Sequence, residues 1–209
     1  MGKTIVEIVV VGKDHEGVVA GFTNFVFQKG GNIEKINQNV IKSLFGMYLE
    51  ASFTQKINIK KFDHEIQVLA KNLKMEVNTH HEATLRKRVA VLVTKEPHCL
   101  ESLLEARKKS QLKGDIGVII GTENTLSSLA RKSKIPFVLV NDVDQSKAEE
   151  KILAVIKRYN VDLIVLARYM RVLSPNFVWR YPNRIINIHP SLLPAFPGAF
   201  AYVQAYERG

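Results

Sequence analysis

The sequence predicts two consecutive α/β domains: a ferredoxin-like α+β domain over residues 1–84, and a doubly wound parallel-sheet domain over residues 85–209. Two observations support this fold class. The first part shows the order strand, helix, strand, strand, helix, strand, which is the split β-α-β arrangement. The second part alternates short apolar runs with amphipathic helices, as parallel sheets with helical crossovers do. With 209 residues, 46% of them hydrophobic, the chain can bury a sizeable core.

The elements of the first domain follow from hydrophobic periodicity and turn residues. Residues 4–11 are rich in Ile and Val and predict a strand. A helix with one apolar face follows, and a Gly-Gly pair ends it. The turn Lys42-Ser43 is expected to join two strands in a hairpin. The later elements are expected at residues 33–41, 44–53, 60–73 and 75–79, and the helix residues expected in the core are Val18, Val19, Phe22, Phe25, Val26, Phe62, Ile66, Leu69, Ala70 and Leu73.

The second domain begins with a continuous apolar strand, as expected for a strand buried on both faces. Pro97 then opens a helix, because proline is well tolerated in the first helical turn. Ser174 is expected to cap a short helix near the end of the domain. Strands are predicted at residues 89–94, 116–120, 137–140, 163–166 and 185–188, with further helices at 123–132, 146–159 and 175–180.

Composition excludes several classes of protein. The sequence has no run of 18 apolar residues, no visible secretory signal and a single cysteine, Cys99, so a cytoplasmic protein is expected. A net charge of +10 raises the question of an RNA partner. The basic residues are scattered, however, so we expect no nucleic acid and no membrane partner. His80 and His81 are expected on a linker surface, where neighbours point opposite ways, so we predict no metal site.

Asn187 and His189 lie two residues apart where the last predicted strand ends. Residues at this spacing in a strand point to the same face, so an amide and an imidazole would stand together at its carboxyl end. An amide can donate to a developing oxyanion, and an imidazole can move a proton near neutral pH. The pair therefore suits attack on an acyl or formyl carbon. The alternative is that Asn187 caps a turn and His189 fills a loop.

These two residues belong to a longer motif. Residues 187–194, Asn-Ile-His-Pro-Ser-Leu-Leu-Pro, resemble the motif of enzymes that use 10-formyltetrahydrofolate, and so do residues 166–174, Leu-Ala-Arg-Tyr-Met-Arg-Val-Leu-Ser. The resemblance implies a formyltransferase-like domain in which the catalytic residues Asn187 and His189 flank the formyl group, with no cofactor beyond the folate substrate. It implies that the substrate is bound by Met170, Arg171, Val172, Leu173, Ser191, Leu192, Leu193 and Pro194.

The loop after the first strand of the second domain bears on the formyl acceptor. Residues 94–98, Thr-Lys-Glu-Pro-His, lack the glycines that cradle a phosphate, and Glu96 adds a negative charge. Water is then the expected nucleophile, and the chain resembles the formyltetrahydrofolate deformylases, which release formate for purine and one-carbon metabolism. The alternative is a formyltransferase to an amine of the glycinamide ribonucleotide type. Residues 190–193, Pro-Ser-Leu-Leu, look more like that version.

The turn after the first strand, Asp-x-x-Gly-aliphatic, resembles the ACT domain, a regulatory module that binds amino acids between paired copies. This implies an effector site at Asp14 and Gly17 and a homo-oligomer. Judged from the residues alone, Asp14 would cap a helix and Gly17 would permit close backbone approach. A non-enzymatic amino-acid sensor is therefore a rival function.

The family also places a catalytic Asp in a later loop. No residue of this sequence matches it, since Asp142 and Asp162 lie on earlier elements. We therefore expect a chain that is truncated at its C-terminus, and the missing Asp puts its activity in doubt.

Overall fold

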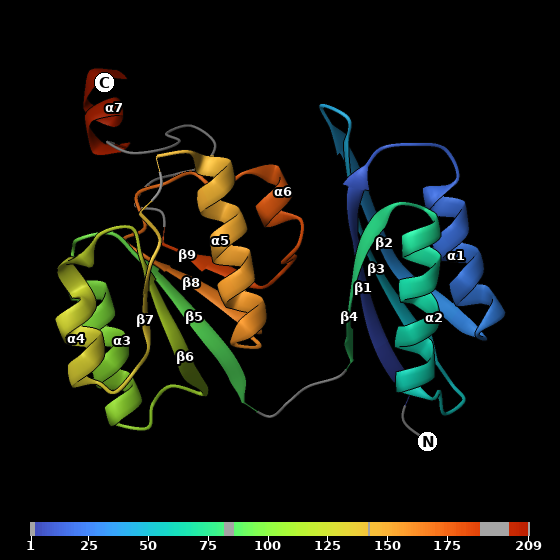
Figure 1. Cartoon of the computed structure of the whole chain (residues 1–209), viewed down its shortest axis with the longest axis horizontal. Helices are drawn as coiled ribbons and strands as arrows, with labels where there is room; N and C mark the ends of the chain where they lie inside the picture. Colours follow the sequence, from blue (N-terminus) through green and yellow to red (C-terminus); the bar gives the residue numbers. More distant parts are fainter. Residues whose placement is uncertain (1–2, 82–85, 142, 189–200, 209) are drawn as a thin grey trace. The chain divides into compact units, whose positions relative to one another are not determined.

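The computed structural model describes residues 3–81, 86–141, 143–188 and 201–208. Its contacts divide the chain of Figure 1 into two units. Unit 1 holds Met1–Thr84 and Ser174–Pro182, and unit 2 holds Leu85–Leu173 and Asn183–Gly209. The division falls between residues 84 and 85, where the sequence analysis put its domain boundary. The grouping of Ser174–Pro182 with unit 1 was not expected.

Unit 1 is built on a four-stranded antiparallel sheet in the order β2-β3-β1-β4. The helices α1 and α2 lie against one face of this sheet, which gives the predicted split β-α-β arrangement (Figure 1). The elements of the sheet and its helices are β1 (Thr4–Lys13), α1 (Val18–Gln28), β2 (Gly31–Ile41), β3 (Leu44–Phe53), α2 (Ile59–Asn72) and β4 (Met75–His81).

The turn between β2 and β3 has the backbone of a tight hairpin. Lys42 and Ser43 have φ values of 49° and 65°. Two positive φ values in succession characterise the type I′ turn, whose twist matches that of the flanking strands. The predicted hairpin at Lys42-Ser43 is therefore confirmed, and the backbone N–H of Asp14 donates to the Ser43 carbonyl at 2.8 Å beside it.

The core of unit 1 lies between the sheet and its two helices. Alternate residues of β1, among them Ile8, face the helices and are fully buried. Val19, also predicted for the core, is 36% exposed because it lies at the margin of the apolar stripe in the first turn of α1. The predicted helix residues that are buried are Val18, Phe22, Phe25, Val26, Phe62, Ile66 and Ala70, while Leu69 and Leu73 are partly buried against them.

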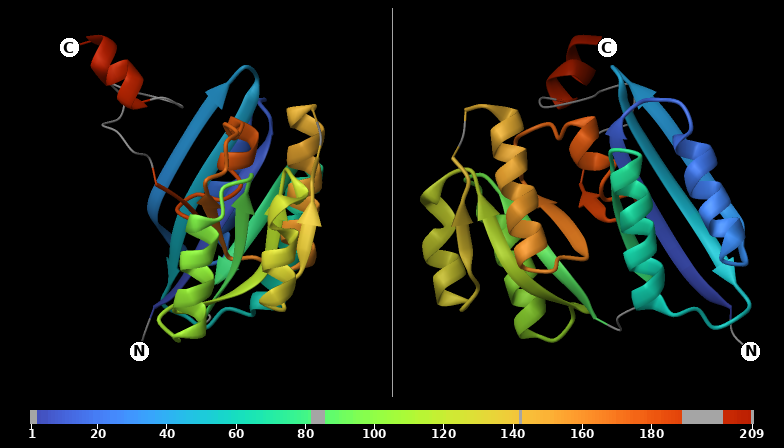
Figure 2. Two further views of the ribbon diagram at one scale, coloured as in Figure 1. Left: turned by 90° about the vertical axis from the view of Figure 1, so that its left-hand side faces the viewer. Right: turned by 45° about the vertical axis from the view of Figure 1, so that its right-hand side comes forward.

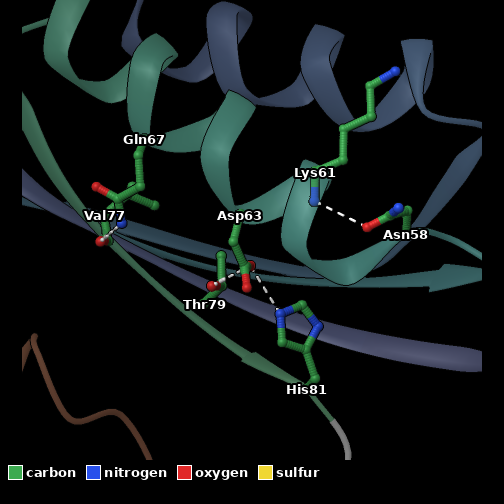
Figure 3. A network of polar contacts seen from close by, with 7 residues as sticks. All are labelled: Asn58, Lys61, Asp63, Gln67, Val77, Thr79 and His81. Atoms are coloured by element: carbon green, nitrogen blue, oxygen red, sulfur yellow. Dashed lines mark hydrogen bonds and ion pairs between the residues drawn. The ribbon is translucent and has the colours of Figure 1, made fainter.

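The two histidines before the domain boundary are not linker surface, as the sequence analysis expected. His80 and His81 are the last residues of β4, where they pair with β1. His81 Nε2 lies 2.8 Å from Oδ1 of Asp63 in α2, and that oxygen also accepts a hydrogen bond from Thr79 Oγ1 at 2.7 Å (Figure 3). This polar network holds the end of β4 against α2, which extends the strand beyond its apolar part.

The other face of the unit 1 sheet is covered by Ser174–Pro182, which contains α6 (Pro175–Val178). Trp179 packs there against two valines of β1 and a tyrosine of β3. A Cβ added to Gly46 would stand 2.3 Å from the indole ring, so this glycine makes room for Trp179. Arg180 forms an ion pair with Glu76 of β4. Ser174 caps α6 as predicted, because its hydroxyl accepts from the N–H of Phe177.

Unit 2 is built on a five-stranded parallel sheet in the order β7-β6-β5-β8-β9. The helices α3 and α4 lie on one face of it and α5 on the other (Figures 1 and 2), which confirms the prediction of a doubly wound sheet. Its elements are β5 (Lys87–Val93), α3 (His98–Lys108), β6 (Gly114–Gly121), the 3₁₀ helix η1 (Asn124–Leu126), α4 (Ser127–Lys132), β7 (Phe137–Leu139), α5 (Gln145–Arg158), β8 (Leu163–Ala167), β9 (Ile185–Asn187) and α7 (Ala201–Arg208).

The central strand β5 explains why the sheet is sandwiched between helices. Val89, Val91 and Val93 are buried on the face that α3 and α4 cover. Ala90 and Leu92 point to the other face and have no exposed area. A strand buried on both faces needs helices on both faces. None of the helices in the described ranges is long and apolar enough to cross a membrane.

Candidate active site

The carboxyl ends of the parallel strands meet at one edge of the unit 2 sheet. β5 ends at Val93, opposite Gly121 of β6 and Ala167 of β8, and β9 ends at Asn187, opposite Leu166. The strand order turns back between β5 and β8, because β6 and β7 continue to one side and β8 and β9 to the other. Ligands bind beside such a switch point in open α/β sheets. The loops after β5 and β8 therefore frame the candidate site.

Asn187 stands at this edge, at the strand end where the sequence analysis placed it. It is the last residue of β9 and its side chain is exposed. An exposed amide at this position can donate a hydrogen bond to a group bound in the crevice. The remaining predicted residues of this motif lie outside the part of the chain that the structure describes: His189, Ser191, Leu192, Leu193 and Pro194.

Residues 168–173, directly after β8, bring apolar side chains to the same edge. Met170 is 52% exposed and Val172 is 81% exposed, while Arg171 and Leu173 are half-buried. Arg168 has a φ of 58°, so the chain leaves β8 through a left-handed conformation that costs a non-glycine residue roughly 1–2 kcal/mol. Ligand sites combine exposed apolar surface with a few polar groups, and this segment and Asn187 supply both.

Two side chains hold the backbone of this segment. The N–H of Met170 donates to Thr94 Oγ1 at 3.0 Å, and Gln145 Nε2 donates to the Val172 carbonyl at 2.7 Å. Thr94 directly follows β5, and Gln145 is the first residue of α5. Neither role could be predicted from the sequence, because these residues are 76 and 27 positions from their partners and carry no motif of their own.

A buried carboxylate lies near the segment and was also missed. Glu149 is 5% exposed and accepts a hydrogen bond from Gln145 Nε2 at 3.1 Å. Burial raises the pKa of Tyr169; the positive charge of Arg171 opposes this shift and the negative charge of Glu149 adds to it. The sequence holds a signal for Glu149, since it precedes the buried Ile152 of α5 by three positions and so shares its apolar face.

Asp162 belongs to the opposite, amino-terminal edge of the sheet. Its Oδ2 accepts from the Arg88 N–H at 2.8 Å, and its own N–H donates to the Arg88 carbonyl at 2.7 Å. These bonds join the starts of β5 and β8, which agrees with leaving Asp162 out of the catalytic set. Asp142 lies outside the described residues. Within the described ranges, no three His, Cys, Asp or Glu side chains are grouped so that they could hold a metal ion.

The loop after β1 carries the two residues assigned to an effector. Asp14 is exposed and does not cap α1, which begins after Gly17 and has no side-chain cap. Position 17 favours glycine because its φ is +85°, a conformation that other residues rarely adopt. Close packing is not the reason, since nothing described lies within 4 Å of where a Cβ would be. His15 ties the loop to α2: Nδ1 lies 2.9 Å from the Glu16 carbonyl and Nε2 2.7 Å from the Leu73 carbonyl. These two carbonyls raise the pKa of His15.

Comparison with known proteins gives consistent results for both parts of the chain. Residues 87–209 match the family model described as formyl transferase. The formyltetrahydrofolate deformylase of Haemophilus influenzae is 40% identical over 198 residues, covering 94% of this chain and 70% of that protein. The formyltetrahydrofolate deformylase of Bacillus subtilis is 36% identical over 201 residues, covering 94% of this chain and 67% of that protein.

Solved structures of two kinds of enzyme match the chain. A formyltetrahydrofolate deformylase from Pseudomonas syringae matches 100% of this chain and 71% of its own, with a TM-score of 0.56 and 30% identity. A glycinamide ribonucleotide transformylase from Symbiobacterium toebii matches 63% of this chain and 64% of its own, with a TM-score of 0.55 and 30% identity. The deformylase match thus extends over both units.

Proposed function

Because the chain belongs to the formyl transferase family and, within it, to the formyltetrahydrofolate deformylases, we propose that it hydrolyses 10-formyltetrahydrofolate to formate and tetrahydrofolate. The observation that carries the proposal is the position of Asn187 at the carboxyl edge of the sheet. It ends β9, which pairs with β8, and the exposed Met170 and Val172 lie in the segment directly after β8. A formyl group carried on a pterin needs an apolar wall for the ring and a donor for the formyl oxygen.

The proposed reaction assigns one role to each catalytic residue. A water oxygen bonds to the formyl carbon, and the carbonyl oxygen becomes an oxyanion that the Asn187 amide stabilises by donating a hydrogen bond. The bond from the formyl carbon to N10 then breaks, N10 takes a proton, and formate leaves. His189, assigned by the family resemblance, moves the proton from the water to N10. Catalysis needs no cofactor in this scheme.

The loop after β5 supports water as the formyl acceptor. Residues 94–98 contain no glycine, and Pro97 stands at the N-cap of α3, where it provides no N–H. The half-buried Glu96 adds negative charge where an acceptor phosphate would have to bind. Transfer to an amine is the second candidate, because a glycinamide ribonucleotide transformylase structure matches 63% of this chain.

Unit 1 is proposed to be an ACT-like regulatory domain. Two features support this proposal. The strand order is β2-β3-β1-β4 with both helices on one face, and the loop that contains Asp14 and Gly17 is held to the end of α2 by His15. An amino acid bound at that loop would be the effector, and paired copies of the domain would make the protein a homo-oligomer. We also propose that the protein is cytoplasmic and that the formate it releases supplies purine synthesis.

Product analysis tests the proposed function. The chain is incubated with 10-formyltetrahydrofolate, alone and with glycinamide ribonucleotide, and formate, tetrahydrofolate and formylated amine are quantified. We expect one formate for each tetrahydrofolate in both cases, and formate release slower by about 10²-fold or more in His189→Ala, because a positioned acid or base contributes about that factor. Formylated amine in place of formate would show a transferase. Calorimetric binding of an amino acid with no folate binding would show a sensor.

A further inference from the structure

The backbone of residues 170–172 is held at two points by side chains of other elements. At the first, Thr94 at the end of β5 accepts from the N–H of Met170 at 3.0 Å. At the second, Gln145 at the start of α5, the helix that leads into β8, donates to the carbonyl of Val172 at 2.7 Å. Residues 168–173 belong to no helix or strand. Hydrogen bonds from other elements are therefore needed to fix where this segment stands.

Gln145 is itself held in place. The Asp144 carboxylate caps α5 by accepting from the N–H groups of Ser146 at 2.9 Å and Lys147 at 3.3 Å. Gln145 Nε2 also donates to Oε1 of Glu149, which is almost fully buried. A donor fixed at a capped helix start restricts the carbonyl that it binds, and so removes conformations that the segment would otherwise sample.

The geometry points to a role for these two anchors in substrate binding. We propose that Thr94 and Gln145 are positioning residues, which hold the backbone of Met170 and Val172 so that their exposed side chains form a fixed wall for the pterin ring. This proposal rests on the proposed function, because it concerns how the same site binds the folate. Neither anchor acts on the formyl group in this account. Their loss should therefore raise the Kd and KM for the folate and leave kcat nearly unchanged.

Substitutions that keep the shape of the side chain test the proposal. Thr94→Val removes the hydroxyl that accepts from Met170, and Gln145→Met removes the amide that donates to both the Val172 carbonyl and Glu149. We expect each to weaken tetrahydrofolate binding, measured by calorimetry, about fivefold, because one neutral hydrogen bond is worth about 1 kcal/mol. Thr94→Ser keeps the hydroxyl and should bind like the unmodified chain. Ser102→Ala, which loses a 2.9 Å bond to the His98 carbonyl within α3, is the matched control and should also leave binding unchanged.

Amide hydrogen exchange supplies a second measurement on the same proteins. Exchange at the Met170 N–H should be faster in Thr94→Val than in the unmodified chain, and unchanged in Ser102→Ala. Because Gln145 is exposed, its replacement is not expected to unfold the protein. The affinity of Gln145→Met for tetrahydrofolate can therefore be measured even if Thr94→Val does not fold.

The outcomes separate this proposal from the proposed function. Unchanged affinity in both Thr94→Val and Gln145→Met, in a chain that does bind tetrahydrofolate, would overturn the role of the anchors and leave the deformylase proposal standing. An equal loss of affinity in Ser102→Ala would also overturn it. If the unmodified chain binds no folate, the proposed function and this inference fail together.

Discussion

Replacing Asn187 by alanine is expected to slow formate release by about 10²–10³-fold, the usual effect of removing one oxyanion donor. The amide stands exposed at the carboxyl end of β9, so its loss leaves the sheet pairing unaffected. Tetrahydrofolate has no formyl group, and its affinity should therefore change less than about twofold. The measurement is kcat at saturating 10-formyltetrahydrofolate, together with the Kd of tetrahydrofolate by calorimetry.

A matched amide elsewhere controls for the Asn187 result. Asn78 is exposed on β4 of unit 1, and Asn78→Ala should leave both kcat and the Kd of tetrahydrofolate unchanged. Asn187→Asp should be at least as slow as Asn187→Ala, because it replaces a donor by a negative charge beside a developing oxyanion. A kcat for Asn187→Ala within about threefold of the unmodified chain would mean that this amide stabilises no oxyanion.

Replacing Phe22 by alanine should lower the free energy of unfolding of unit 1 by about 3–5 kcal/mol. Phe22 has no exposed area and lies in the core between α1 and the sheet, so truncation leaves a cavity. The chain has a single tryptophan, Trp179, which belongs to unit 1 and packs on its sheet. Urea unfolding followed by tryptophan fluorescence therefore reports on unit 1 specifically.

The same helix provides the control for this prediction. Phe27 is 77% exposed, and Phe27→Ala is expected to change the free energy of unfolding by no more than about 0.5 kcal/mol. Both variants remove the same ring from α1, so their difference isolates the effect of burial. Equal destabilisation by the two substitutions would contradict the placement of the unit 1 core.

Much of the fold could be predicted because local patterns determine it. The strand β5 is apolar without interruption from Val89 to Val93, which is typical of a parallel strand covered on both faces. The hairpin at Lys42-Ser43 and the cap at Ser174 follow from short-range chemistry. Asn187 could be placed at a strand end because the end of an apolar run can be seen in the sequence.

Contacts between distant parts of the chain could not be predicted. The bond between Thr94 and Met170 joins residues 76 positions apart, and neither residue is unusual in its own segment. Trp179 follows a motif of the second domain in sequence, yet it packs on the sheet of unit 1. His81 was misassigned because its strand is extended by a polar network, which hydrophobic periodicity does not reveal.

The central claim is that the pterin of the folate substrate binds at the carboxyl edge of the unit 2 sheet, beside residues 168–173 and Asn187. Amide NMR spectra of the unmodified chain, recorded as tetrahydrofolate is added, test it most directly. The largest shift changes should fall on Met170, Val172 and Asn187, with none at Asp162 on the opposite edge. Shift changes confined to that opposite edge, or to the loop of unit 1 that contains Asp14, would contradict the account.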